Sequence, residues 1–259
     1  MPSDKDNAEL HEELLLLLKK FDGVCRRNDI KYSLHGGTLL GAVREKGFIP
    51  WDDDADISLT RENFSKLRNV FVNVKSTDEL YFDEVSSTVV MIWLRRNGKI
   101  PVWIDIFIYD YISENFFLQK LKILGLVFFL GITKTDKRIK LTAKGEYKGV
   151  RFAVAYGLYT LGRLFSHETK LKWKNKFSAN CLVGNKRYMV RSNDQYKGLK
   201  LIISHNAVKD YLMIPFENTE LMVHAGYAEI LRSSYGDDYM TPVRMNEYEV
   251  SAHKVIRES

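Results

Sequence analysis

The sequence has little cysteine, since only Cys25 and Cys181 occur among its 259 residues. Two cysteines supply neither a disulfide framework nor a four-thiolate zinc site. The first six residues are polar and acidic, unlike the basic and then apolar opening of a secretory signal. We therefore expect the protein in the reducing cytoplasm.

A long uncharged apolar run is also missing. Residues 116–132 come nearest, but Lys120 and Lys122 interrupt them, so this stretch is too short and too charged to predict a bilayer-spanning helix. A basic flank over 134–148 follows. Together the two stretches indicate either an interfacial element or a buried helix. The interfacial reading predicts peripheral contact with an anionic membrane, at the inner face of the cell membrane.

Acidic residues are scarce in the middle of the chain. Residues 115–200 contain 19 Lys and Arg against four Asp and Glu, so this segment carries +15 and the remainder −9. A basic region beside an acidic one predicts an anionic partner for the first and a cation site in the second. No RNA-binding motif is visible, so we do not expect a nucleic-acid partner. A non-catalytic binder of RNA or anionic glycans remains the alternative from a different class.

Hydrophobic periodicity and turn residues predict a mixed α and β chain. The predicted elements are a helix over 8–27, strands over 30–34 and 54–59, helices over 38–44 and 61–70, an Asn97-Gly98 hairpin of 88–95 with 100–108, basic helices over 115–176, a hairpin of 212–216 with 220–224, and a helix over 227–235 ended by Gly236. We expect an α+β fold: a mixed sheet with flanking helices and a basic helical lobe. The expected domains are a catalytic core over 1–114, the lobe over 115–200, and a part over 201–259 that packs back on the core.

Three aspartates lie in apolar surroundings. Asp54 and Asp56 are two apart on a predicted strand, so their side chains project from one face and can bind one cation. Asp105 lies between isoleucines on a neighbouring predicted strand. Burying an unpaired carboxylate is very costly, and a divalent metal supplies the compensating charge. The six histidines show no ligand spacing, so the pattern predicts a magnesium or manganese site held by carboxylates.

A glycine pair precedes these aspartates. Gly36 and Gly37 separate a short predicted strand from a predicted helix. Small residues let backbone amides approach phosphate oxygens, and the start of a helix favours anions. The pair alone is weak evidence, but together with the three aspartates it predicts a metal-dependent phosphoryl-group transferase.

The order of these features resembles the nucleotidyltransferase superfamily, in which a glycine turn precedes an Asp-x-Asp strand and a later acidic strand residue. The segment from Leu34 to Asp56, which ends in Trp-Asp-Asp-Asp-Ala-Asp, is similar to the hallmark of the LicD family. Two later blocks also resemble that family, namely Ile104-Asp105-Ile106-Phe107 followed by Asp110, and Tyr235-Gly236-Asp237 followed by Pro242 and His253.

The resemblance implies a reaction. LicD proteins attach phosphocholine from CDP-choline to bacterial cell-surface glycans, and the related fukutin proteins attach ribitol phosphate from CDP-ribitol. Too few cysteines are present for the zinc-binding insertion of a fukutin relative, which favours the phosphocholine branch. The expected acceptor is a lipid-linked glycan precursor of the teichoic acid or lipopolysaccharide type, with release of CMP. Transfer of another CDP-activated alcohol phosphate, or a nucleotidyltransferase acting on a nucleoside triphosphate, remains the alternative.

The resemblance also implies roles for the site residues. Asp54, Asp56 and Asp105 would bind one or two magnesium ions at the donor pyrophosphate, with Asp105 either a ligand or the base for the acceptor hydroxyl. The residues expected to contact the donor are Gly36, Gly37, Thr38, Arg44 and Trp51. Direct metal contact stays open for Asp52 and Asp53, as does a phosphate contact for Lys46 and any role for His35 and His253. The nearest candidates for an aromatic cage around choline are Trp93, Trp103, Tyr109 and Tyr111.

Overall fold

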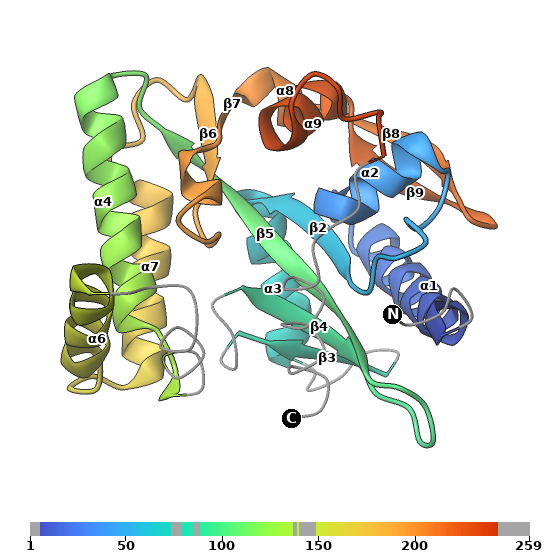
Figure 1. Ribbon diagram of the computed structural model, residues 1–259, viewed down its shortest axis with the longest axis horizontal. Coiled ribbons are helices and arrows are strands. Elements are labelled where there is room, and N and C mark those ends of the chain that lie inside the picture. Colours follow the sequence, from blue (N-terminus) through green and yellow to red (C-terminus); the bar gives the residue numbers. More distant parts are fainter. Residues whose placement is uncertain (1–5, 74–78, 85–88, 137–138, 140–148, 243–259) are drawn as a thin grey trace. The chain divides into compact units, whose positions relative to one another are not determined.

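The structure, a computed structural model, describes residues 6–73, 79–84, 89–136, 139 and 149–242 (Figure 1). The chain forms two compact units. The first comprises residues 1–82, 91–107 and 206–259, and the second comprises 83–90 and 108–205, as far as these are described. Strand β5 (Val102–Ile112) belongs to the first unit up to Phe107 and to the second from Ile108.

The first unit contains most of the path β1-β2-β5-β4-β3 of a seven-stranded sheet; Asp83 of β3, Val90 of β4 and the second half of β5 belong to the second unit. The strands besides β5 are β1 (Ser33–Leu34), β2 (Ala55–Thr60), β3 (Leu80–Asp83) and β4 (Val90–Leu94). Alternation along the strands buries Ile57 and Leu59 of β2 and Ile104 and Ile106 of β5, because successive side chains point to opposite faces. The strands β2 and β5 are neighbours in this sheet. The residues between these buried positions therefore project from the other face.

Helices and a hairpin complete the first unit. The helices are α1 (Asp6–Arg27), α2 (Gly36–Arg44), α3 (Arg61–Asn73), α8 (His205–Lys209) and α9 (Tyr227–Tyr235). The first residue of α8 belongs to the second unit. The hairpin consists of β8 (Tyr211–Phe216) and β9 (Thr219–His224). Leu14, Leu17 and Phe21 of α1 are fully or almost fully buried, as helical spacing requires of a core-facing stripe. The His224 backbone N–H donates to Ser33 Oγ at 2.9 Å, which ties the hairpin to β1.

The second unit combines a short sheet with a helical lobe. Strand β6 (Tyr188–Arg191) pairs antiparallel with the second half of β5 and with β7 (Ile202–Ser204). The helical elements of this unit are α4 (Phe116–Ile132), α6 (Val150–Gly162), α7 (His167–Asn180) and the 3-10 turn η1 (Gly198–Lys200). Its core contains Ile112, Leu126, Val190 and Leu199. Lys122 of α4 is fully buried, and its Nζ donates to the carbonyls of Tyr111 (2.5 Å) and Ser178 (2.8 Å).

The expected α+β fold is confirmed, with local differences. Helix α2 begins at Gly36 rather than at residue 38, so the glycine pair forms its first turn. Strand β2 begins at Ala55, just after Asp54. In the turn before β5 only Gly98 of the Asn97-Gly98 pair has positive φ (72°), whereas positive φ was expected at both. Among the described residues, no helix has the length and apolar character needed to cross a bilayer.

Candidate active site

Three carboxylates converge in the first unit, on one face of its sheet. Asp54 lies just before β2, Asp56 is the second residue of β2, and Asp105 lies on the neighbouring strand β5. One oxygen from each of the three lies within 4.8 Å of the others. All three side chains are half-buried, whereas Ile104 and Ile106, on either side of Asp105, are fully buried. The structure thus brings together the aspartates that strand alternation placed on one face.

The glycine pair at the start of α2 packs directly against two aspartates. A Cβ atom at Gly36 would overlap Asp56 Oδ2, and a Cβ atom at Gly37 would overlap Asp52 Oδ2. Gly36 also has φ of 54°, a backbone conformation that favours glycine. Both positions therefore need glycine for the carboxylates to lie where they do. The first N–H groups of a helix have no partner within the helix, so this turn presents donors beside the acidic cluster.

Backbone hydrogen bonds hold α2 against β2. The Asp56 N–H donates to Thr38 Oγ1 and the His35 N–H donates to the Asp56 carbonyl, both at 2.9 Å. Thr38 is fully buried, so its hydroxyl positions the Asp56 backbone. The His35 side chain is buried too, and its ring lies 4.9 Å from that of Phe107. These two residues thus fix the distance between the glycine pair and Asp56.

A second acidic group adjoins the first. Oxygens of Asp52, Asp53 and Asp54 also lie within 4.8 Å of one another. Asp52 is buried, and its carbonyl lies 2.8 Å from His11 Nε2 of α1. The His11 ring stacks on Phe48 with 4.6 Å between ring centroids. Helix α1 therefore helps to hold the acidic segment, a contact that sequence reasoning missed because residues 11 and 52 share no local pattern.

Glu217, in the turn of the β8–β9 hairpin, holds the loop that leads from α2 to Asp52. Its Oε1 accepts from the Phe48 N–H at 3.0 Å, and its own N–H donates to the Lys46 carbonyl at 2.7 Å. A Cβ atom at Gly47 would overlap the same carboxylate. Glu217 is therefore a positioning residue, and no pattern in the sequence singles it out.

The remaining predicted donor-binding residues lie farther along the chain. Arg44 is in the last turn of α2, about 12 Å along the axis from Gly36 at the standard helical rise. Its Nε pairs with Glu45 Oε1 at 2.7 Å. Lys46 is exposed, and Trp51 is half-buried in the turn before Asp52. His253 lies outside the described residues.

The donor atoms of the cluster fit a hard divalent cation. Both acidic groups offer only carboxylate oxygens, and in the described part of the chain no cysteine or histidine joins them. Magnesium and manganese prefer such ligands, whereas zinc sites usually include nitrogen or sulfur. Three half-buried carboxylates repel one another unless a cation or protons compensate their charge. Asp54, Asp56 and Asp105 are the residues that would hold the ion.

Comparison with known proteins matches residues 29–124 to the nucleotidyltransferase domain of the LicD, fukutin and fukutin-related proteins. The match includes the glycine pair and all three converging aspartates. Over these residues the chain is thus similar to the LicD family domain. It is 29% identical over 252 residues to the lipopolysaccharide cholinephosphotransferase LicD of Haemophilus influenzae, covering 88% of this chain and 89% of that protein.

Two uncharacterized Rickettsia proteins are similar to only part of this chain. The Rickettsia typhi protein is 33% identical over 120 residues, which cover 44% of this chain and 33% of that protein. The Rickettsia prowazekii protein is 31% identical over 110 residues, which cover 40% of this chain and 41% of that protein. Of these three relatives, the Haemophilus protein is the one whose similarity extends over nearly the whole chain.

Asp110, in the later LicD-like block, belongs to the second unit. It is buried on β5 and accepts a short hydrogen bond from Ser192 Oγ. The Ile108 N–H donates to Asn193 Oδ1 at 2.7 Å, and Ser192 N–H donates to the Ile108 carbonyl at 2.9 Å. Asp110 therefore holds the segment after β6 against β5.

The aromatic candidates fall into two sets. Trp103 and Phe107 share the face of β5 that carries Asp105, and the Trp103 ring lies 4.9 Å from that of Trp93 on β4. Tyr109 is buried in the second unit, where Tyr111 contacts His205 Nε2 at 3.2 Å. The first set alone flanks an aspartate of the cluster.

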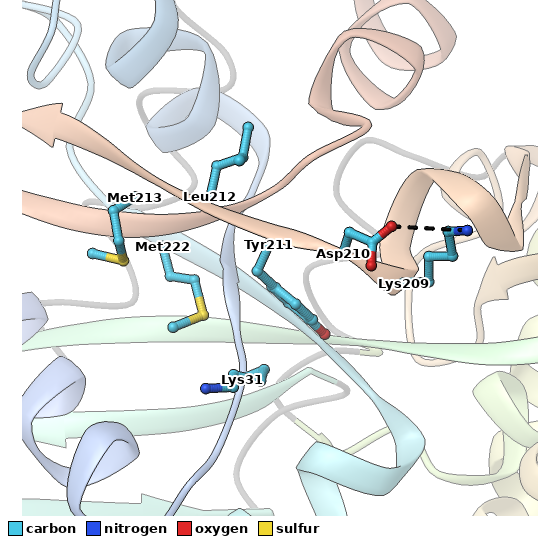
Figure 2. A pocket seen from close by; sticks show the side chains of 7 residues that line it. All are labelled: Lys31, Lys209, Asp210, Tyr211, Leu212, Met213 and Met222. Carbon is cyan, nitrogen blue, oxygen red and sulfur yellow. Dashed lines mark ion pairs between the residues drawn. The ribbon is translucent and has the colours of Figure 1, made fainter.

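A pocket of about 320 Å³ lies at the β8–β9 hairpin of the first unit (Figure 2). It is lined by Lys31, Lys209, Asp210, Tyr211, Leu212, Met213 and Met222, none of which is a candidate-site residue. Burial raises the pKa of Tyr211 to about 12, so its hydroxyl stays protonated at neutral pH. Lys209 and Asp210 pair at 3.8 Å. The described residues of the lining include one carboxylate, Asp210, and no group of acidic residues that could hold a divalent cation, so the carboxylate cluster is the better candidate.

Proposed function

We propose that this chain transfers phosphocholine from CDP-choline to a cell-surface glycan precursor and releases CMP. The observation that supports a phosphoryl transferase is the convergence of Asp54, Asp56 and Asp105 within 4.8 Å beside the first turn of α2. Similarity to a lipopolysaccharide cholinephosphotransferase over 88% of the chain favours phosphocholine as the transferred group and a glycan as the acceptor.

The proposed reaction is a displacement at phosphorus. A hydroxyl oxygen of the acceptor forms a bond to the phosphorus that carries choline, the bond from that phosphorus to the bridging oxygen breaks, and CMP leaves with the bond electrons. The hydroxyl proton passes to a base. Asp105 is either that base or a third metal ligand, because its carboxylate lies among the other two.

The chain's own residues bind and orient the donor in this scheme. Asp54 and Asp56 would hold magnesium or manganese, which when bound offsets negative charge on the departing CMP. The Gly36 and Gly37 N–H groups, at the start of α2, favour phosphate oxygens at the same place. Thr38 keeps Asp56 in position by accepting from its backbone N–H.

The aromatic residues beside Asp105 favour a cationic headgroup. Trp103 and Phe107 lie two positions on either side of Asp105 along β5, and the Trp103 ring, which is 3% exposed, contacts that of Trp93. Aromatic faces attract a quaternary ammonium through the ring quadrupole, which favours choline over an uncharged alcohol. The Arg95 guanidinium lies 5.3 Å from the Trp93 ring centroid, so this ring already contacts one cation.

The direct test is a panel of donors with magnesium and a choline-free lipopolysaccharide or teichoic acid as acceptor. CMP should form from CDP-choline, and the glycan should gain the mass of phosphocholine. Asp54→Asn and Asp56→Asn should each lower the transfer rate at least about a thousandfold. Each substitution removes a ligand of the metal ion that would offset negative charge in the transition state. Asp29→Asn is the matched control, because that exposed aspartate of the same unit pairs with Lys31 and Lys66 at the surface.

The alternatives are separate outcomes of the same panel. Formation of CMP from CDP-ribitol or CDP-glycerol, but not from CDP-choline, would show that the enzyme transfers a different alcohol phosphate. The assignment of the active site would be unchanged. Pyrophosphate released from a nucleoside triphosphate would instead make the chain a nucleotidyltransferase. Unchanged turnover in Asp54→Asn and Asp56→Asn would remove these carboxylates from the mechanism.

A further inference from the structure

Helix α4 of the second unit exposes an apolar stripe. Phe117, Leu121, Leu124 and Phe128 recur at spacings of four, three and four, so they lie along one side of the helix. Phe117 is 71% exposed and Leu124 is 65% exposed. The opposite side of α4 is used for packing, since Leu126 belongs to the core of the unit. An amphipathic surface helix would place polar residues where this stripe lies.

Helix α6 repeats this arrangement. Val150, Val154 and Leu161 lie on one side and are 79%, 58% and 42% exposed. The other side packs on α4: a Cβ atom at Gly162 would overlap the Ile132 carbonyl, and one at Gly131 would overlap the Leu158 side chain. Figure 1 shows α4 and α6 side by side in this unit. Each helix therefore packs one apolar side against the other helix or the core of the unit. A second apolar side of each helix is exposed to solvent.

The charged residues within these two helices are of one sign. Neither α4 nor α6 contains an aspartate or glutamate, whereas α4 has Lys120 and α6 has Arg151, both exposed. Lys120 Nζ lies 4.2 Å from the ring centroid of Phe116, which is 68% exposed. The sequence from 115 to 200 carries +15. An occupant of this face must therefore offer both apolar material and negative charge.

An aromatic pair lies where α6 leads into α7. Phe165 and Trp173 contact each other with 5.0 Å between ring centroids, and they are 42% and 43% exposed. Tryptophan is enriched at membrane interfaces because its ring is apolar and its N–H is polar. The pair thus adds a third group of half-exposed apolar side chains to the same unit.

We infer that the exposed faces of α4 and α6 dock on the surface of a bilayer that contains anionic lipid. The apolar stripes would enter the headgroup boundary while Lys120 and Arg151 meet lipid phosphates. Helices of 17 and 13 residues suit this orientation in the membrane plane better than a span. A second copy of the chain would bring another basic face and no acidic group from these helices, so charge complementarity favours the lipid. The inference does not depend on the transfer reaction, because docking is measured without donor or acceptor.

The test is sedimentation of the full chain with vesicles of phosphatidylcholine, with and without phosphatidylglycerol. The parent should bind the anionic vesicles, bind neutral ones less, and release as salt screens the charges. Phe117→Ser with Leu124→Ser should weaken partition roughly tenfold, as should Val154→Ser with Leu161→Ser, because each pair removes apolar area from the boundary. Val72→Ser is the matched control, since Val72 is 64% exposed on α3 of the first unit.

Circular dichroism must show that the variants keep the parent's helix content. Tryptophan fluorescence, to which Trp173 contributes together with Trp51, Trp93 and Trp103, should shift to shorter wavelength on binding in the parent and in Val72→Ser, and less in the two double variants. Equal binding to both vesicle types at every salt concentration would overturn the inference, as would full binding by both double variants. A second copy of the chain would be the occupant instead if two results came together. The parent would bind no vesicles, and it would self-associate without lipid in a way that Phe117→Ser with Leu124→Ser abolishes.

Discussion

The two units of the chain use polar and apolar residues in opposite ways. The first unit gathers half-buried carboxylates on a sheet whose other face is closely packed, and its α1 buries its leucine stripe. The second unit is basic, leaves apolar stripes of α4 and α6 in solvent, and buries Lys122 in its core. Catalytic sites concentrate charge of one sign around a cation, whereas interfacial surfaces combine apolar side chains with basic ones. Under the two proposals made above, the first unit carries the chemistry and the second carries the membrane contact.

Among substitutions that compare the two units with a matched position in each, the largest effect should come from closing the space beside the acidic cluster. Gly36→Ala should lower transfer activity at least about a hundredfold, because the new Cβ atom displaces the Asp56 carboxylate and misplaced reacting groups lose about that much. Gly149→Ala in the second unit is the matched control: Gly149 has similar positive φ (60°) but nothing within 4 Å of its Cβ position. Steady-state rates of the two variants compare the units directly.

Equal losses of rate in the two glycine variants would show that strain at positive φ, and not the packing against Asp56, limits activity. In that case the glycine pair would be a folding requirement only. Magnesium binding measured by calorimetry separates the two explanations, because only displacement of Asp56 weakens it.

A smaller effect should come from the core of the basic unit. Lys122→Met removes the ammonium that donates to the carbonyls of Tyr111 and Ser178, so the free energy of unfolding should fall by about 1–3 kcal/mol. Lys120→Met on the exposed side of the same helix should change it by less than about 0.5 kcal/mol. Urea denaturation measures both. Equal destabilisation by the two substitutions would contradict a structural role for the buried lysine in this unit.

An effect that appears only in acid concerns the stability of the first unit. Burial lowers the pKa of His224 to about 3, while an unfolded histidine titrates near 6.5. The unfolded state therefore binds the extra proton first, so stability present above pH 6.5 is lost as pH falls toward 3. One such group contributes a slope of about 1.4 kcal/mol per pH unit within that window.

His224→Asn should lack this slope, so the difference in stability between parent and variant should change with pH within that window, whatever the variant costs at neutral pH. Thermal melts from pH 7 to pH 4 measure it. A variant whose stability falls with acid as steeply as the parent's would contradict a neutral, buried His224.

Local patterns predicted much of the fold because their physics is local. Alternation placed Asp54, Asp56 and Asp105 on one face, and turn residues predicted the β8–β9 hairpin and the end of α9 at Gly236. The helical lobe followed from a basic and apolar pattern without strand signals. These features depend on residues only a few positions apart in the chain, so a single sequence is enough to predict them.

Contacts between distant segments could not be predicted in the same way. His11 supports Asp52 from 41 positions away and Glu217 holds Phe48 from 169 positions away, so neither contact leaves a period in the sequence. Gly36 and Gly37 were expected as a turn, but packing against Asp56 and Asp52 makes them the first turn of α2. The exposure of α6 also needs the structure, because an apolar helix pattern predicts burial until its packed side is known.

The most direct test of the catalytic site compares magnesium-dependent melting of the parent and Asp105→Ala. Without metal the three carboxylates repel one another, so Asp105→Ala should be at least as stable as the parent. Saturating magnesium should stabilise the parent, by about 2.7 kcal/mol at a hundred times Kd, and the variant clearly less, with almost no transfer activity left. Identical magnesium shifts in both proteins, with activity preserved in Asp105→Ala, would contradict the claim that these three aspartates form one metal-binding active site.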